Sequence, residues 1–418
     1  MKINIISLLS EHDMKLHEEL ESLYRSKFPQ ALVSLHIFDA TALKDCIGCW
    51  NCWVKAPGLC IHNDNMEEIY KLIMSSDQVV LALPTQAQFL SGAAKTFIDR
   101  LIPLFHPYII VHKNELMHEE RYHDFPVLDY YFDSVGLTDE GTKVIEDYLS
   151  RTATHFRVDS AIVKHDISGS LIQIPLTNRQ PAEDLEWQPL PEEYRKGKIV
   201  LYNCSPRGKK GNSLKILNGI TKGIEASGVP NEDILIRHLV EKSNHEEWVQ
   251  DFHNHSRHFF VLPLYVHAMP GTVMKFFEKI EPSTTGTCQL SFFVQSGFTE
   301  GFQSHYLRAW LARFPMQINC LYGGTLIKGG MESLQMKPDQ ANQKLYLQLS
   351  ALGEAYALEG MMSESTVHAL ASRAHLSTTE KIILPIIMKS PLGRMYWDMQ
   401  LKRNGAYERR FDRPYESI

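Results

Sequence analysis

The feature that most constrains the fold is a regular alternation of short apolar runs with helical patterns. Apolar runs bounded by turn residues predict buried strands, and strands that alternate with helices predict βαβ units around a parallel sheet. The expected strands of the first half are 3–9, 32–39, 78–83, 127–132 and 160–164, and the helices between them are 14–28, 65–75, 91–104 and 140–155.

The same order of elements starts again roughly 190 residues later. This period is far too long for a solenoid repeat, so it indicates two tandem domains. We therefore expect an α/β protein with two doubly wound, five-stranded parallel sheets. The expected strands of the second half are 198–202, 233–238, 258–262, 290–295 and 318–327, and its helices are 214–226, 245–252, 272–280 and 302–314.

Domain boundaries follow from shifts in composition. Residues 166–196 contain several prolines and no clear period, which is typical of a linker between domains 1–165 and 197–360. Residues 361–418 are expected to form a helical C-terminal extension, with helix caps at Ser363 and Ser377.

Charge and hydropathy exclude some partners. The 418 residues carry a net charge of −6 with no long basic run, which disfavours nucleic-acid binding. No apolar run approaches the length that spans a bilayer, and the N-terminus does not read as a signal peptide. We therefore expect a cytoplasmic protein with no membrane partner.

One loop of the second half has the composition of a phosphate cradle. It follows the strand that ends at Tyr202 and precedes a helix, so the positive end of that helix points at the loop. No carboxylate lies between Cys204 and Ser213. The alternative is an ordinary turn with a solvated basic tip. The candidate phosphate-binding residues are Ser205, Arg207, Gly211, Asn212 and Ser213.

Two further loops of the second half follow strands and would share the same sheet edge. The loop after the third strand resembles a segment of the first half, since both begin Leu-Pro and continue to Gly and Lys. Aromatic and methionine side chains there suit a flat ring system, although core packing is the alternative for Tyr265 and Met269. The candidates in these two loops are Pro263, Leu264, Tyr265, Val266 and Met269, then Ser296 and Gly297.

Four of the seven cysteines fall in one loop of the first half, at Cys46, Cys49, Cys52 and Cys60. Three thiolates spaced two residues apart can cap one face of a cubane, and a fourth returns after a turn. Structural zinc more often uses two separate pairs. A [4Fe–4S] cluster, a metal-free redox-active thiol loop and a zinc site therefore stay open. The scattered cysteines at 204, 288 and 320 are expected to fill core or loop positions.

These loops resemble the NAD(P)H-dependent FMN reductases of the flavodoxin-like fold. The family motifs correspond here to Ser205-Pro206-Arg207 with Gly211-Asn212-Ser213, and to Pro263-Leu264-Tyr265 before the Pro270-Gly271 helix. The first half, with its cysteine loop, resembles the iron–sulfur flavoprotein branch of the family. The resemblance implies two tandem flavodoxin-like units, with FMN phosphate on the first motif and the isoalloxazine ring beside the second.

The resemblance also implies a function. FMN would accept hydride from transiently bound NAD(P)H and pass electrons to a small acceptor such as a quinone or flavin. Two alternatives are an electron carrier with a redox-protein partner and a non-catalytic flavin-binding redox sensor. A homodimer is also compatible with the family. Because Glu11 and Asp13 would repel phosphate in the first half, we expect FMN in the second half.

Overall fold

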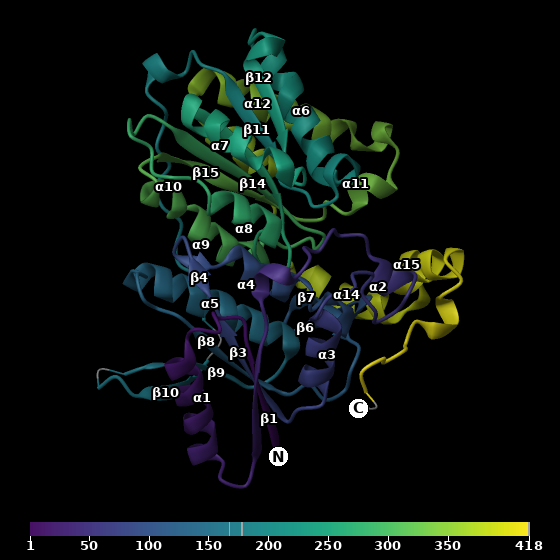
Figure 1. The fold of residues 1–418 in the computed structure, drawn as a ribbon. Coiled ribbons are helices and arrows are strands. Elements are labelled where there is room, and N and C mark those ends of the chain that lie inside the picture. Colours follow the sequence, from purple (N-terminus) through teal and green to yellow (C-terminus); the bar gives the residue numbers. More distant parts are fainter. Residues whose placement is uncertain (167, 177–178, 417–418) are drawn as a thin grey trace. The chain divides into compact units, whose positions relative to one another are not determined.

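The computed structural model describes residues 1–166, 168–176 and 179–416. The chain divides into two compact units, and each is described by itself (Figure 1). The first unit comprises residues 1–180 together with 377–418, and the second comprises residues 181–376. Among the described residues, no helix is both long enough and apolar enough to cross a membrane.

The sheet of the first unit has the order β10-β9-β8-β3-β1-β2. All neighbours pair in parallel except β10, which runs antiparallel to β9. The strands are β1 (Lys2–Ser7), β2 (Leu32–Ile37), β3 (Gln78–Leu83), β8 (Val127–Phe132), β9 (Ser160–His165) and β10 (Leu171–Pro175). The α-helices of this unit before residue 180 are α1 (Met14–Lys27), α2 (Asn51–Val54), α3 (Met66–Met74), α4 (Gly92–Asp99) and α5 (Asp139–Phe156).

The sheet of the second unit has the order β12-β11-β13-β14-β15, and every neighbouring pair is parallel. Its strands are β11 (Ile199–Asn203), β12 (Ile234–His238), β13 (Arg257–Pro263), β14 (Gln289–Gln295) and β15 (Leu321–Lys328). Its helices are α6 (Asn212–Ala226), α7 (His245–Asn254), α8 (Gly271–Phe277), α9 (His305–Leu311), α10 (Phe314–Gln317), α11 (Ser333–Met336), α12 (Gln343–Glu359) and α13 (Glu364–Leu370).

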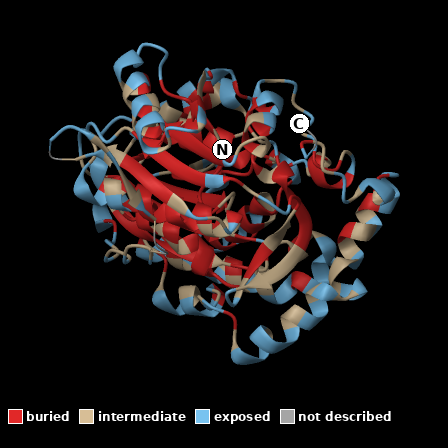
Figure 2. Cartoon of the chain, turned by 90° about the horizontal axis from the view of Figure 1, so that it is seen from below, coloured by how far each residue is buried: buried red, intermediate tan, exposed pale blue. Residues whose placement is uncertain are grey.

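Numbered within each unit, the five parallel strands therefore have the same order, 2-1-3-4-5. This is the flavodoxin-like order of doubly wound α/β domains, and it confirms the expected fold class. The central strands are apolar and buried along most of their length (Figure 2), as expected for strands that helices cover on both faces.

The units differ in what covers the first helix. In the second unit, α12 crosses α6 at a distance that only glycine permits, because a Cβ on Gly223 would collide with the backbone of Ser350. A Cβ on Gly353 would likewise collide with Ile220. Among the described residues of the first unit no such helix follows β9, and Leu171 of β10 packs with the core beneath α1 instead.

Three features lie outside the sequence expectation for residues 1–166. They are the short hairpin β4 (Thr85–Gln86) and β5 (Phe89–Leu90), the longer hairpin β6 (Phe105–His112) and β7 (Glu115–Glu120), and the short helix α2. Charged residues interrupt the apolar alternation of the longer hairpin, so its strands carry little periodic signal. Its turn places Lys113 and Asn114 at positive φ.

The domain boundaries also differ from those expected. The 166–196 segment does not act only as a linker, because it contains β10, and Trp187 and Gln188 pack along β15 of the second unit. The helices of 361–418 are not one extension: α13 belongs to the second unit, whereas α14 (Thr378–Lys389) and α15 (Pro391–Arg403) belong to the first. Residues 167, 177–178 and 417–418 of these segments lie outside the described residues. The expected caps at Ser363 and Ser377 are present.

Candidate functional site

Three loops of the second unit meet at one edge of its sheet. Strands β11, β13 and β14 are adjacent and parallel, so the segments after Asn203, Pro263 and Gln295 leave from the same edge. The strand order reverses between β11 and β13, and ligands of open α/β sheets bind at such a switch point. The structure therefore brings together the three segments that hold the expected cofactor-binding residues.

The loop after β11 is held in a tight turn by its own polar groups. The Ser205 N–H donates to Oδ1 of Asn203 at 3.2 Å, and Nδ2 of Asn203 donates to the Gly208 carbonyl at 3.1 Å. Gly208 has a φ of +56°, a conformation that glycine adopts without strain. The Arg207 N–H donates to Oγ of Ser205 at 3.2 Å. The loop is thus preorganised by hydrogen bonds.

Where the loop meets α6, the Ser205 side chain packs directly against Gly211. A Cβ on Gly211 would collide with Oγ of Ser205, so only glycine fits there. Helix α6 starts without a side-chain cap, and the first N–H groups of a helix have no intrahelical acceptor. These groups and the helix dipole favour an anion at this position.

Two buried polar atoms at the start of α6 have no partner among the described residues. They are Oγ of Ser213 and Oδ1 of Asn212. The Asn212 Nδ2 donates to the Met331 carbonyl at 2.8 Å, so this amide ties the segment after β15 to the loop. A buried hydroxyl without a partner costs free energy unless a ligand satisfies it. The Ser213 hydroxyl therefore fits a bound phosphate oxygen.

The loop carries positive charge from Arg207, Lys209 and Lys210, and the Glu332 carboxyl group lies near Arg207. Nη2 of Arg207 donates to Oε1 of Gln335 at 3.2 Å. Burial raises the pKa of Glu332, and Arg207 partly opposes that rise. Glu332 and Gln335 follow the last strand, and no motif in the sequence pointed to them. Their proximity to Arg207 depends on the path of the chain from β15 towards α6.

The segment after β13 forms a narrow turn. The Tyr265 N–H donates to the Ala268 carbonyl at 2.8 Å and the return bond is 3.0 Å, while Val266 and His267 have φ values of 38° and 63°. Met269 is fully buried, which agrees with the core-packing alternative for that residue. The remaining candidates differ in exposure: Pro263 is buried, and Leu264, Tyr265 and Val266 are half-buried.

The segment after β14 is anchored to its neighbours. The Ser296 N–H donates to the Lys328 carbonyl at 3.1 Å, and Oγ of Ser296 donates to the Phe298 carbonyl at 3.2 Å. A Cβ on Gly297 would lie 3.7 Å from Cβ of Glu332. The Ser296 N–H is thus already used within the protein, and a ligand at this loop would meet Gly297.

The corresponding edge of the first unit has different chemistry. Oγ of Ser7 hydrogen-bonds Nε2 of His17 at 2.8 Å in the buried interior, and burial lowers the pKa of this histidine. A cavity of about 460 Å³ adjoins the start of α1, and its charged lining includes Asp13, Glu19 and Lys15. Two carboxylates and an occupied serine do not make a cradle for a phosphate dianion.

The cysteine loop connects β2 to α3 in the first unit. Cys52 is buried, Cys46 and Cys60 are half-buried, and Cys49 is exposed. Burial raises the pKa of Cys52, and the thiols of the other three raise it further, so all four lie within electrostatic range. Burial also raises the pKa of Cys46 to about 12. Within the described residues, however, no three His, Cys, Asp or Glu side chains form a group that could hold a metal ion.

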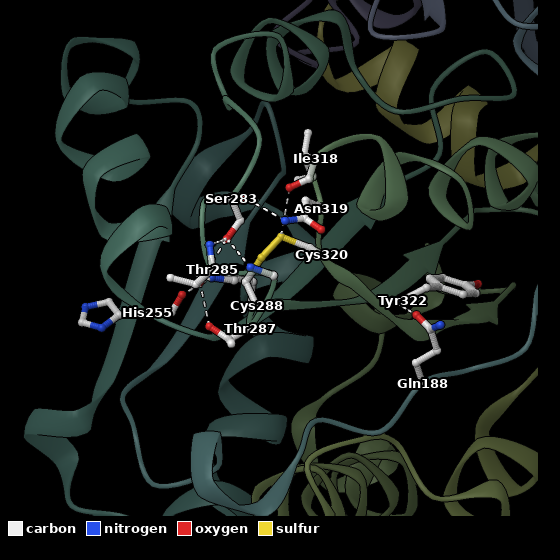
Figure 3. The surroundings of a disulfide bond; sticks show 12 residues. Gln188, His255, Ser283, Thr285, Thr287, Cys288, Ile318, Asn319, Cys320 and Tyr322 are labelled. Carbon is white, nitrogen blue, oxygen red and sulfur yellow. Dashed lines mark hydrogen bonds between the residues drawn. A yellow bond between two sulfur atoms is a disulfide. The ribbon is translucent and has the colours of Figure 1, made fainter.

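Two of the scattered cysteines form a disulfide, which corrects their expected role as filler. Cys288 and Cys320 precede β14 and β15, at the edge opposite the three loops, and their Cα atoms are 4.9 Å apart (Figure 3). The parallel pairing of the two strands brings these positions together, and the Leu321 N–H donates to the Cys288 carbonyl at 2.8 Å. Nothing in the sequence indicates that these two cysteines, 32 residues apart, pair with each other.

Comparison with known proteins finds relatives for part of the first unit. Residues 16–118 match the model of the NADPH-dependent FMN reductase family. The chain is 41% identical over 61 residues to an iron–sulfur flavoprotein of Archaeoglobus fulgidus, which is 15% of this chain and 27% of that protein. It is 38% identical over 55 residues to an iron–sulfur flavoprotein of Methanocaldococcus jannaschii, or 13% and 27% of the two chains.

These matches confirm the resemblance expected for the first half, although the chain spans only about a quarter of the length of these curated relatives. Solved structures give weaker likenesses. An FMN-dependent NADH-azoreductase from Bacillus anthracis in complex with FMN is 12% identical, with a TM-score of 0.31 over 38% of this chain and 99% of that chain. An NAD(P)H:quinone oxidoreductase from Methanothermobacter marburgensis is 14% identical, with a TM-score of 0.29 over 38% and 94%. The fold assignment therefore rests on the strand order.

Proposed function

We propose that this chain, related through residues 16–118 to NADPH-dependent FMN reductases, is an NAD(P)H-dependent FMN oxidoreductase. We further propose that its second unit binds the flavin. The observation that carries this proposal is the start of α6, where the buried Ser213 hydroxyl has no partner among the described residues and where the Ser205 side chain leaves room only for glycine at position 211. These features suit a phosphate monoester.

In this proposal the phosphate lies against Ser205, Arg207, Ser213 and the first N–H groups of α6. Gly211 permits the close approach, and the Asn212 amide holds the neighbouring segment in place. FMN, when bound, supplies the hydride and electron chemistry. The protein contributes the binding site, and the half-buried Tyr265 is exposed enough to contact a ring at the switch point.

The segment after β13 would form one wall of the ring site, from Pro263 to Met269, and the Ser296-Gly297 segment would form another. The double hydrogen bond between Tyr265 and Ala268 fixes the first wall. NAD(P)H would then bind transiently, and electrons would pass to a small acceptor such as a quinone or flavin. A cytoplasmic location and a homodimer remain predictions.

A second function is favoured by the cysteine loop, namely an iron–sulfur flavoprotein that carries electrons to a redox-protein partner. The loop lies within the region matched by the family model, and its four thiols are within electrostatic range of one another. In this proposal Cys46, Cys49, Cys52 and Cys60 would ligate a [4Fe–4S] cluster after local rearrangement, because the described side chains do not already form a metal-binding group.

The test is to purify the full chain without oxygen and to quantify flavin and iron per chain. About one FMN and no iron, with rapid NADPH or NADH oxidation by an artificial quinone, is the result expected for the reductase. About four irons and an absorption shoulder bleached by dithionite would favour the electron carrier. A colourless protein that takes up no added FMN would refute both functions.

A further inference from the structure

The cysteine loop of the first unit is covered by the far end of the chain. The Trp397 ring on α15 meets Trp50 at 5.2 Å and Trp53 at 5.4 Å between centroids, both edge to face. These two tryptophans flank Cys52, which belongs to the same apolar cluster as Trp397 and Leu401. Packed aromatic rings therefore separate this thiol from solvent.

A second contact closes the loop at its turn. Gly58 has a φ of +83°, and its N–H donates to the Cys52 carbonyl at 2.9 Å. A Cβ on Gly58 would lie 2.7 Å from Cδ of Pro414, so the C-terminal segment lies directly against this turn. Arg409 adds a hydrogen bond from Nη2 to the Lys55 carbonyl at 3.1 Å.

Arg121 holds this segment in place from inside the unit. Its side chain is fully buried, and Nη1 donates to the carbonyls of Arg410 at 3.2 Å and Asp412 at 2.9 Å. Its Nε donates to the Pro103 carbonyl at 3.0 Å. No carboxylate of the described residues forms an ion pair with it, and burial lowers its pKa to about 10.

A buried cation without an ion-pair partner is costly, so it needs compensation from nearby dipoles or anions. The backbone carbonyls of the C-terminal segment supply dipoles. The groups that favour the charged form of Arg121 include Cys52. The guanidinium therefore links the C-terminal segment to the interior beside the cysteine loop.

We propose that residues 391–416 form a protective cover over the cysteine loop, which shields Cys52 from water and oxidants, and that Arg121 is the positioning residue that clamps this cover. The cover does not depend on a metal or on flavin. It deepens the proposed redox role of the loop, and its test can fail independently of flavin binding in the second unit.

The experiment follows the alkylation rate of each free cysteine in the full chain by mass spectrometry. We expect Arg121→Met and Trp397→Ala to increase the rate at Cys52 at least tenfold, while Cys204 in the second unit keeps its wild-type rate. Arg257→Met is the matched control. Arg257 is equally buried and also donates to backbone carbonyls, but in the second unit.

The control should leave the Cys52 rate unchanged, and FMN content should not change in the Arg121 and Trp397 variants. If the sheet amides of the first unit lose their hydrogen-exchange protection in Arg121→Met, that variant has unfolded, and Trp397→Ala and the milder Trp397→Phe decide. A Cys52 rate within twofold of wild type in the folded variants would overturn the proposal.

Discussion

The two units share a backbone plan but differ in the loop that follows their first strand. In both, the residue after that strand donates to the third strand, Leu8 to Ala82 at 2.9 Å and Cys204 to Val261 at 3.1 Å. In the second unit the loop then leads to the unpartnered hydroxyl of Ser213, whereas in the first unit Ser7 is bonded to His17. Two units with the same strand order thus differ in the chemistry at the same edge of the sheet, and the anion site proposed for the second unit has no counterpart in the described residues of the first.

The segment after the third strand extends the comparison. In the first unit Ala87 and Gln88 have φ values of 50° and 58° in the turn of the β4–β5 hairpin, and in the second unit Val266 and His267 adopt the same left-handed pair. Neither pair contains glycine, so both units retain a strained turn at equivalent positions. This shared turn supports the predicted duplication more strongly than the loops after the first strands, which differ between the two units.

The largest expected difference between the units comes from removing the proposed phosphate-binding groups of the second unit. We expect Ser205→Ala with Arg207→Ala to weaken FMN binding by about 4 kcal/mol, or on the order of a thousandfold, since hydrogen bonds to a charged group contribute about 1.5–3 kcal/mol each. Flavin fluorescence titration measures the effect. The matched change in the first unit, Ser10→Ala with His12→Ala, should leave FMN affinity unchanged. Loss of flavin from that control instead would move the site to the first unit.

The disulfide offers a second contrast, since the described free cysteines of the first unit form no such bridge. Replacing Cys288 and Cys320 with serine should lower the free energy of unfolding of the second unit by about 3.7 kcal/mol, because the bridge closes a loop of 32 residues in the unfolded chain. Denaturant unfolding followed by hydrogen exchange separates the two units. A reducing agent should then have no further effect on this variant, and an unchanged second unit would contradict the prediction.

Buried histidines provide the smallest expected effect, and they occur in both units. Burial lowers the pKa of His106 in the first unit and of His258 in the second to about 3. The folded state then binds fewer protons than the unfolded state, so stability is complete above pH 6.5 and falls as the pH decreases towards 3. At pH 5 each histidine should cost about 2 kcal/mol of stability.

Unfolding measured at pH 7 and pH 5 checks this expectation in His106→Phe and His258→Phe, each of which should lose part of the pH dependence. His106 also faces Arg121, Arg394 and Arg413, which lower its pKa further. Acid should therefore loosen the cover over the cysteine loop, and His106→Phe should abolish that effect. An identical pH slope in both variants and the wild type would show that these histidines do not titrate on unfolding.

Most of the fold could be predicted from the sequence because period and turn residues encode it locally. Each of the ten expected parallel strands is present, as are the caps at Ser363 and Ser377. The hairpin that ends at Glu120 and strand β10 were missed because polar residues obscure their alternation. The contact of Gly223 with α12 could not be predicted, because the sequence does not show which element packs against a glycine within a helix.

Local sequence patterns were enough to predict the fold class, the presence of two units and the composition of the candidate loops, since these depend on residues that are neighbours in the chain. Which polar groups are available to a ligand depends on long-range contacts. The path of the chain placed His17 against Ser7, left the Ser213 hydroxyl without a partner among the described residues, joined Cys288 to Cys320 and placed Trp397 over the cysteine loop. None of these features can be recognised from the spacing of the residues in the chain, because burial and packing, rather than a local pattern, produce them.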